Sequence, residues 1–335
     1  MNMKLNFVFW GTPDIAAETL EILKNNGYIP CLIITAPDKP QGRKMIITPP
    51  SVKIWAQKNN IPFLQPEKLD EEFISKVLGK SDLSGNPGSL TYPKTFSKFD
   101  LFIVVAYGKI IPEKIINLPK FGSINIHYSL LPKYRGASPV ESAILNGDTE
   151  TGISIQKMEF KMDAGPIIAQ EKINILPDEK SPELYKKLIP AGAELLVKVL
   201  PQLVQRSDLE NSKRSDLGTN SLTPQNESLA TFCKKIKKED GLVDLEKDSP
   251  SILYNKFRAY AEWPRIYFFE KKLPAGHNRI IITDVFFQGQ TLGIQKGLTL
   301  EKKQSPSVVP QFIIKKVIPE GKKEITWQEF QRNIL

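Results

Sequence analysis

Residues 121–136 read FGSINIHYSLLPKYRG, and residues 146–166 read NGDTETGISIQKMEFKMDAGP. Asn125 and His127 are two residues apart in an apolar run, so a β-strand there would point both side chains to one face of its sheet. That strand would run into the SLLP turn, and α/β proteins place their active sites where strands end in loops. Asp163, in a Met-Asp-Ala-Gly-Pro turn, is a natural third polar member of this site.

The N-terminal segment has the pattern that opens a doubly wound α/β sheet. An apolar run over residues 4–10 is followed by the turn GTPD and then by a helical pattern through Leu23. A dinucleotide-binding turn needs three glycines at fixed spacing, and only Gly11 is present, so binding of NAD, FAD or a P-loop nucleotide is disfavoured. The continuous apolar run over residues 99–107 predicts a central parallel strand that is buried on both faces.

The length of 335 residues, 41% of them hydrophobic, allows two domains. We expect an α/β domain over residues 1–205, with an exposed insertion at about 79–97 and a helical stretch, 182–204, interrupted at Pro190. A polar linker or insertion over 206–226 is expected to mark the domain boundary. Short β-type runs between turn residues predict a small barrel or sandwich within residues 227–335.

The formal net charge is +9, and most of it lies near the C-terminus. Residues 231–335 hold 19 Lys or Arg against 12 Asp or Glu, an excess of +7. A basic C-terminal third indicates a polyanionic partner, with nucleic acid as the first candidate. The alternative is an ordinary lysine-rich solvated surface.

Cysteine usage and the N-terminus predict a cytoplasmic location. Cys31 and Cys233 are far apart in the sequence and do not suggest a disulfide framework, which indicates a reducing compartment. The N-terminus MNMKLNFVFW lacks a secretory pattern, and no apolar run approaches the roughly 20 residues that span a bilayer, so no membrane partner is expected.

A proline-rich basic loop is expected between a strand over residues 28–35 and a helix that begins near Ser51. It carries Lys39, Arg43 and Lys44. The loop is longer than a strand-to-helix connection requires, and such loops lie at the functional edge of a sheet. It is either a basic finger that reaches a nucleic-acid backbone or an ordinary surface loop.

The residue types of the expected site, an amide, an imidazole and a carboxylate, favour direct acyl transfer between two bound substrates. Two histidines and two separated cysteines do not make a zinc site, and no Gly-x-Ser-x-Gly motif is present, so no metal and no acyl-enzyme are expected. Attack of an amine on a carbonyl creates an oxyanion, to which the Asn125 amide and a protonated His127 can donate hydrogen bonds. Asp163 would favour the imidazolium and help to move the proton of the amine. A lone histidine on a strand can also be a purely structural group.

The combined pattern resembles the folate-dependent formyltransferases, in particular those that act on charged initiator tRNA. The resemblance lies in FWGTPDIAAETLEIL, APDKPQGRKMIITPPSVKIWA, VVAYGKIIP, INIHYSLLPKYRGASPV, GDTETGISI and MDAGPI, and near the C-terminus in ATFCKKIKKEDGLVDLEK, FRAYAEWPRIYFF and PEGKKEITWQEF. It implies a Rossmann-like catalytic domain followed by an OB-like, tRNA-binding barrel. It also implies transfer of the formyl group of 10-formyltetrahydrofolate, as co-substrate, to the α-amino group of methionyl initiator tRNA in translation initiation.

The resemblance also assigns roles to residues. It makes Asn125, His127 and Asp163 the catalytic residues, and it implies that Lys39, Arg43 and Lys44 lie in the element that engages the acceptor end of initiator tRNA. No metal or nucleotide cofactor is implied, and a monomer is expected. The residues implied to bind folate are Tyr107, Gly108, Lys109, Ile110, Ile111, Ser129, Leu130, Leu131 and Pro132.

Two residues depart from the family pattern, and two alternatives to the implied function remain. Tyr128 and Lys44 differ from the residues common in the family, but alternation along a strand turns Tyr128 away from the face of Asn125 and His127. One alternative is a formyltransferase for an amino sugar nucleotide or another small amine, which would need neither the basic C-terminal third nor the Arg43 loop. The other is a non-catalytic tRNA-binding protein, which would not require the three polar residues.

Overall fold

The computed structural model describes residues 5–42, 44–77, 99–210, 222–273, 278–288 and 309–334, without the side chains of 76–77 and 204–210. These residues form two compact units, each assembled from separate segments of the chain. The first comprises Met1–Arg135, Gly152–Lys172 and Lys187–Phe232, and the second comprises Gly136–Thr151, Ile173–Lys186 and Cys233–Leu335. Within the described part of the chain, no helix is both long and apolar enough to cross a membrane.

Strands and short helices alternate along the first part of the chain, as the opening pattern predicts. The elements before residue 150 are β1 (Phe7–Gly11), α1 (Asp14–Asn25), β2 (Leu32–Ile34), β3 (Lys39–Gln41), β4 (Ile46–Thr48), α2 (Ser51–Lys58), β5 (Phe63–Leu64), α3 (Glu71–Val77), β6 (Leu101–Val105), α4 (Glu113–Ile116), β7 (Ser123–His127), β8 (Arg135–Gly136) and α5 (Pro139–Leu145).

The later elements include the longest helix and a second group of strands. They are β9 (Glu150–Lys157), β10 (Ile167–Asn174), α6 (Ser181–Glu210), η2 (Glu227–Leu229), β11 (Phe232–Cys233), η3 (Lys238–Gly241), α7 (Pro250–Ala259), β12 (Tyr267–Phe269), β13 (Arg279–Gln288), β14 (Gln311–Pro319), β15 (Ile325–Thr326) and α8 (Trp327–Arg332).

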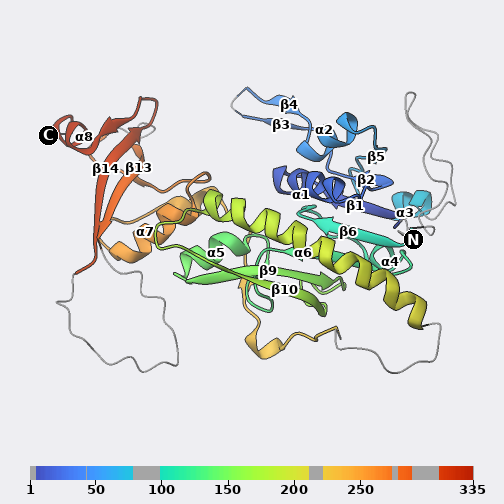
Figure 1. The fold of residues 1–335 in the computed structure, drawn as a ribbon. Coiled ribbons are helices and arrows are strands. Elements are labelled where there is room, and N and C mark those ends of the chain that lie inside the picture. Colours follow the sequence, from blue (N-terminus) through green and yellow to red (C-terminus); the bar gives the residue numbers. More distant parts are fainter. Residues whose placement is uncertain are drawn as a thin grey trace, which may run out of the picture. The chain divides into compact units, whose positions relative to one another are not determined.

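In the part of the chain that the structure describes, the central sheet has seven strands in the order β10-β9-β7-β6-β1-β2-β5. The strands from β5 to β7 run parallel, and β9 joins β7 antiparallel. Every residue of β1 and β6 is buried, as expected for central strands of a parallel sheet covered on both faces. The expected doubly wound sheet is therefore present (Figure 1). Its register places the carboxyl ends of β6 and β7 next to each other.

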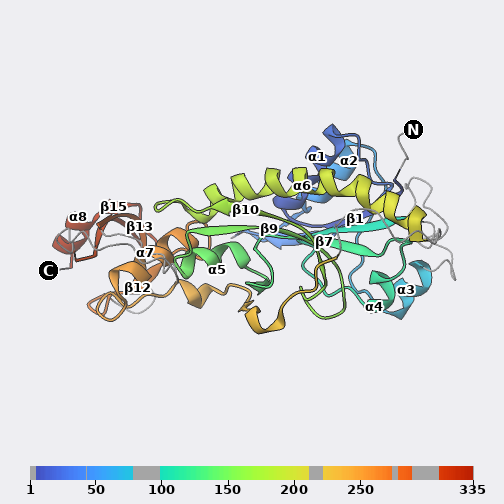
Figure 2. The same cartoon turned by 60° about the horizontal axis from the view of Figure 1, so that its bottom comes forward.

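Helices cover both faces of this sheet, with α1 and α6 on one side and α3 and α4 on the other (Figure 2). Gly192 lets α6 approach closely, since an added Cβ there would lie 3.2 Å from Ile126 and 3.4 Å from the Tyr128 ring. Ile126 and Tyr128 therefore face α6, and alternation turns Asn125 and His127 to the opposite face. This confirms the orientation expected for Tyr128.

The expected interruption at Pro190 is wrong, because α6 continues through Pro190 and Pro201 to Glu210. The apolar face of this helix supplies the physical reason: Leu188, Ala193 and Leu196 are fully buried, and tertiary packing overrides the cost of a proline. The helix also extends into the segment expected as a linker. The residues at 211–221 and the insertion expected at 79–97 lie outside the described residues, and the domain bounds expected from the sequence stay a prediction.

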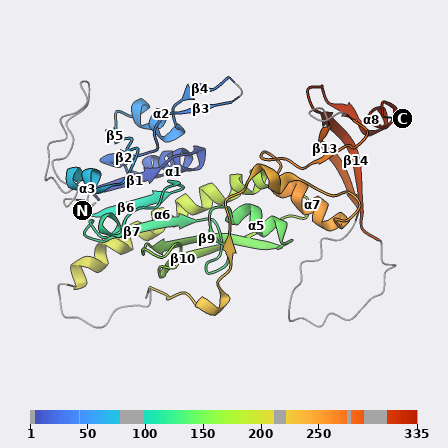
Figure 3. The same cartoon turned by 180° about the vertical axis from the view of Figure 1, so that it is seen from behind.

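The proline-rich basic segment forms a β-hairpin, which the sequence pattern does not predict. β3 and β4 pair antiparallel, with Lys39 opposite Thr48 and Gln41 opposite Ile46. The hairpin extends away from α1 and α2 (Figure 3). Its outer strand and turn expose apolar side chains, with Met45 66% and Ile47 69% exposed.

The second unit contains the expected C-terminal antiparallel β structure. Among the described residues its sheet has the order β12-β13-β14-β15. The Tyr254 ring of α7 stacks on Phe287 of β13 at a centroid distance of 4.3 Å, and Phe330 of α8 packs edge-on against Phe268 of β12 at 6.4 Å. These aromatic contacts fix α7 and α8 on the sheet. Residues 289–308, where the β-type runs were expected to continue, fall outside the described residues.

Candidate active site

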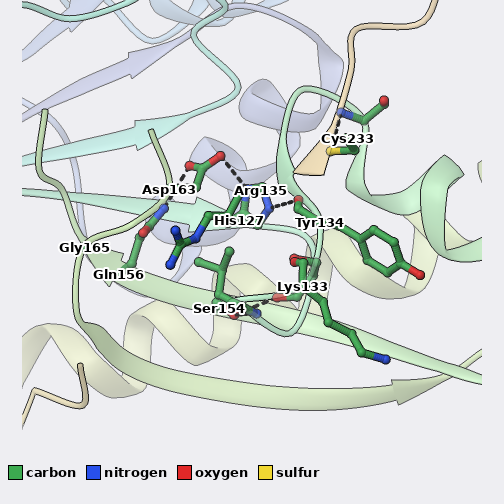
Figure 4. Close-up of polar contacts among 12 residues, drawn as sticks. His127, Lys133, Tyr134, Arg135, Ser154, Gln156, Asp163, Gly165 and Cys233 are labelled. Carbon is green, nitrogen blue, oxygen red and sulfur yellow. Dashed lines mark hydrogen bonds and ion pairs between the residues drawn. The ribbon is translucent and has the colours of Figure 1, made fainter. Parts of the chain in front are cut away.

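The last residues of β7 place two polar side chains on the face of the sheet away from α6. Asn125 lies opposite Gln156 and His127 lies opposite Ser154 in the antiparallel pairing of β7 with β9. Side chains directly opposite each other in such a pair have Cβ atoms about 4.5–5.5 Å apart. The register therefore adds a second amide, that of Gln156, to the pair seen in the sequence (Figure 4).

His127 is buried, and both of its ring nitrogens face protein groups. Nε2 lies 2.9 Å from the backbone oxygen of Tyr134. A carbonyl oxygen only accepts hydrogen bonds, so Nε2 carries a proton. Nδ1 faces Oδ2 of Asp163 at 3.7 Å, and the two side chains are only 6% and 14% exposed. The ring is thus held between a carbonyl and a carboxylate.

Asp163 approaches the imidazole from the turn between β9 and β10. Its Oδ1 accepts a hydrogen bond from Nε2 of Gln156 at 2.9 Å, which leaves Oδ2 toward His127 (Figure 4). The structure thus brings His127 and Asp163 together, and it places Asn125 on the same face, one β-bridge from Gln156. The side chain of Asn125 has no hydrogen-bond partner among the described residues, so its amide can donate to a bound molecule.

The guanidinium of Arg135 is buried close to these polar side chains. Arg135, directly after Tyr134, is fully buried, and its Nη1 and Nη2 donate to the two carboxylate oxygens of Glu227 at 3.1 and 2.8 Å. Lys161 donates to the same carboxylate at 2.7 Å. Hydrogen bonds from Arg135 and then from Lys161 lower the pKa of Glu227 to about 2. The bidentate pair ties the segment after α6 to the active-site turn.

The SLLP turn, expected at the folate site, is fixed by two side chains from β9 and β10. Oγ of Ser154 donates to the backbone oxygen of Ser129 at 2.6 Å and accepts from the backbone N–H of Leu131 at 3.0 Å. Nε2 of Gln170 donates to the Leu131 oxygen at 2.9 Å and to Ser154 at 2.7 Å. Ser129 and Leu131 are buried, so any contact that this turn makes with a ligand involves mainly Leu130, Pro132 and backbone groups.

The segment after β6, also expected at the folate site, is fixed by the packing of Tyr107 and by the hydrogen bonds of Lys109. The Tyr107 ring packs edge-on against Trp10 in the core, and burial raises the pKa of its hydroxyl. Nζ of Lys109 donates to the backbone oxygens of Pro66 and Glu67 at 2.7 and 2.8 Å, and burial lowers the pKa of that amine. Ile111 is buried. Ile110 is 82% exposed, and Gly108 has a φ of +82°, so Ile110 and the backbone are what this loop offers to a ligand.

Two of the residues expected at the tRNA, Lys39 and Lys44, lie on the β3–β4 hairpin and are exposed. The third, Arg43, falls outside the described residues. The positive charge of Lys39 lowers the pKa of Lys109, after the larger effect of burial. The charge on this hairpin therefore acts on the loop that follows β6.

The arrangement suits transfer of an acyl group to an amine. The amide of Asn125 can donate to a developing oxyanion, and the His127–Asp163 pair can hold and pass a proton. The 3.7 Å separation of that pair is longer than a hydrogen bond, as is common before substrates bind. Sequence reasoning missed Gln156, the Tyr134 carbonyl and the Arg135 group. A signal for Gln156 was present in the sequence, because Gln156 alternates in phase with Ser154 along the segment that forms β9.

Comparisons with known proteins agree with this chemistry. A family model described as "Formyl transferase" matches residues 3–200, and one described as "Formyl transferase, C-terminal domain" matches residues 235–334. The methionyl-tRNA formyltransferase of Halalkalibacterium halodurans is 39% identical over 263 residues, which cover 78% of this chain and 74% of that protein. The methionyl-tRNA formyltransferase of Thermotoga maritima is 40% identical over 264 residues, with the same coverage.

Similar solved structures are more distant in sequence. The N-formyltransferase from Helicobacter canadensis, in complex with folinic acid and dTDP-3-aminofucose, is 17% identical with a TM-score of 0.56, covering 96% of this chain and 98% of that one. A 4-N formyltransferase from Francisella tularensis is 22% identical with a TM-score of 0.54, covering 81% and 94%. At these identities the likeness shows a shared fold.

Proposed function

The chain belongs to the formyl transferase family, among the methionyl-tRNA formyltransferases, and from this premise we propose how its residues divide the work. It is an enzyme that transfers a formyl group to methionyl initiator tRNA for translation initiation. All three residues, Asn125, His127 and Asp163, lie within the matched residues 3–200. The observation that supports this residue assignment most directly is that Asn125 and His127 share one face of the central sheet and that Asp163 reaches His127 from the turn between β9 and β10.

The formyl donor is 10-formyltetrahydrofolate, used as a co-substrate. The methionyl α-amine attacks the formyl carbon, a new C–N bond forms, and the bond from that carbon to N10 of the folate breaks. The attacking amine loses one proton and N10 gains one. Asn125 donates to the oxyanion of the tetrahedral intermediate, and the His127–Asp163 pair carries the proton between the two nitrogens.

His127 can also donate to the oxyanion, but with a condition. Its Nε2–H points at the Tyr134 oxygen at 2.9 Å, so donation to substrate requires that hydrogen bond to be shared or exchanged in the complex. The amide of Asn125 needs no such exchange. Asn125 is therefore the direct oxyanion donor, and His127 acts first through its contact with Asp163.

Folate binds against the loop after β6 and the SLLP turn, where Ile110, Leu130 and backbone groups are available. The acceptor end of the tRNA contacts the β3–β4 hairpin with Lys39, Lys44 and Arg43, and the basic C-terminal part binds the tRNA backbone. A cytoplasmic location follows from the role in translation initiation. The monomeric state and the lack of a metal stay predictions from the sequence.

A formyltransferase for amino sugar nucleotides is the alternative to exclude, because the solved N-formyltransferase in complex with dTDP-3-aminofucose shares the fold. The experiment supplies the purified chain with 10-formyltetrahydrofolate and, in parallel, with methionyl initiator tRNA, methionyl elongator tRNA and a dTDP-amino sugar. We expect formylated product from the initiator tRNA and little from the other two. Product from the sugar alone would refute the proposal.

A further inference from the structure

The backbone of Asp163 has an unusual conformation that its neighbours must maintain. Its φ is +51°, in the left-handed region that non-glycine residues seldom adopt. The turn around it is pressed against β9: a Cβ on Gly165 would lie 1.8 Å from the backbone oxygen of Lys157. The backbone N–H of Lys157 also donates to the Pro166 oxygen at 3.0 Å. The position of the Asp163 carboxylate therefore depends on how this turn is anchored.

The side-chain amide of Gln225, in the segment after α6, anchors the turn. Nε2 of Gln225 donates to the backbone oxygens of Asp163 and Gly165 at 2.8 and 2.7 Å. Both protons of the amide are used in this way, on two carbonyls that flank a single residue, Ala164. Gln225 lies in a segment where Thr223 also makes an antiparallel bridge with Ile167, directly after the turn.

The orientation of the Gln225 amide is fixed by the buried guanidinium. Oε1 of Gln225 accepts from Nε and Nη2 of Arg135 at 3.0 and 2.8 Å. A guanidinium has only donors, so the amide oxygen must face Arg135 and the NH2 group must face the turn. Glu227 neutralises the buried guanidinium from the other side and, through Lys161, holds the beginning of the same turn.

We propose that Gln225 is a positioning residue that holds Asp163 in place for the formyl transfer reaction. Gln225 fixes the backbone of Asp163, while Gln156 fixes its Oδ1 and leaves Oδ2 to His127. Nε2 of Gln225 also lies 3.4 Å from Oε1 of Gln156. The two side-chain amides therefore contact each other as well as Asp163. This inference rests on the proposed function of Asp163 as a member of the catalytic pair.

The informative variant is Gln225→Glu. The glutamate carboxylate can still accept the hydrogen bonds of Arg135. Its second oxygen has no proton to donate, so the hydrogen bonds to the backbone oxygens of Asp163 and Gly165 are lost. The attachment to the guanidinium survives, and the attachment to the turn is removed. A displacement of a reacting group by about 1 Å can cost about 100-fold in rate, so we expect kcat to fall by about 10- to 100-fold with KM for both substrates nearly unchanged.

The matched control is Asn226→Ala, at the next residue. Asn226 accepts from the backbone N–H of Ser228 and does not contact the turn, so its kcat should equal that of the wild-type chain. If Gln225 had only a structural role through Arg135, Gln225→Glu would retain wild-type kcat. That result would overturn the proposal.

A second measurement does not depend on activity. Hydrogen exchange of the full chain should show faster exchange at the Ala164 and Lys157 amides, which close the turn, in Gln225→Glu but not in Asn226→Ala. Unchanged exchange at both amides would overturn the inference even if kcat fell. If the wild-type chain formylated no tRNA, the proposed function would fail, while exchange would still decide whether Gln225 holds the turn.

Discussion

Asn125 is the residue whose proposed role rests on the simplest geometry. Its amide lies on the same face as His127 and has no hydrogen-bond partner within the described residues. Asn125→Ala should lower kcat by about 100- to 1000-fold, the usual loss for one oxyanion donor, while KM changes little because the interaction forms in the transition state. Steady-state kinetics with methionyl initiator tRNA measure both constants.

The control for this change is Asn26→Ala, which removes an exposed amide that donates to Ile22 at the end of α1. It should leave both constants unaltered. A fall in kcat below about 10-fold for Asn125→Ala would contradict the role of oxyanion donor.

Glu227 gives a prediction about pH and stability. Because Arg135 and Lys161 hold its pKa at about 2, below the ordinary value of 4.5, the ionised carboxylate stabilises the folded chain above pH 4.5. This contribution is lost as the pH falls from 4.5 toward about 2. The free energy of unfolding should therefore differ between wild type and Glu227→Gln at neutral pH, and the difference should shrink in that window.

Urea denaturation of both chains at about pH 7, 5 and 3.5 measures this change. Added salt should reduce the difference at neutral pH, since the carboxylate is 56% exposed and its ion pairs are screened. A difference that stayed constant down to pH 3.5 would contradict the assignment.

Among the elements, the β3–β4 hairpin carries the prediction about the nucleic acid. Lys39 and Lys44 are exposed on it, while the outer strand presents apolar side chains such as Ile46 and Ile47. Replacing both lysines with alanine removes two cations from a surface proposed to meet phosphates. The slope of log affinity for initiator tRNA against log salt should fall by about 1 for each phosphate that the variant no longer neutralises.

Binding titrations at several salt concentrations measure that slope. Lys24→Ala on α1 is the control, because Lys24 pairs with Glu21 at 3.4 Å and lies outside the hairpin. Folate affinity should change far less than tRNA affinity in the double variant, and it should not change in Lys24→Ala. An unaltered slope for the double variant would place the tRNA elsewhere.

At the scale of the whole molecule, the charge distribution gives a prediction about how the proposed binding of tRNA depends on salt. Seven of the nine net positive charges lie in residues 231–335. Affinity of the full chain for initiator tRNA should fall by about 10³- to 10⁵-fold between about 50 and 200 mM salt if 6–10 phosphates are contacted. Folate affinity should change far less, and a flat salt dependence for tRNA would remove the electrostatic argument.

The sequence by itself determined the features that depend on local pattern. Continuous apolar runs give β1 and β6, and a two-residue spacing puts Asn125 and His127 on one face, because burial and strand alternation act over a few residues. The motifs around these residues were sufficient to identify the family. The double winding of the sheet follows from the same alternation of strands and helices.

Only the tertiary structure decided which distant groups complete the site. Register places Gln156 opposite Asn125, and the chain returns after α6 to bring Gln225 to Asp163. The same long-range packing keeps α6 continuous through Pro190, against its local preference. Local pattern does not encode these contacts, because the free energy that fixes them comes from burial and hydrogen bonds between residues far apart in the sequence.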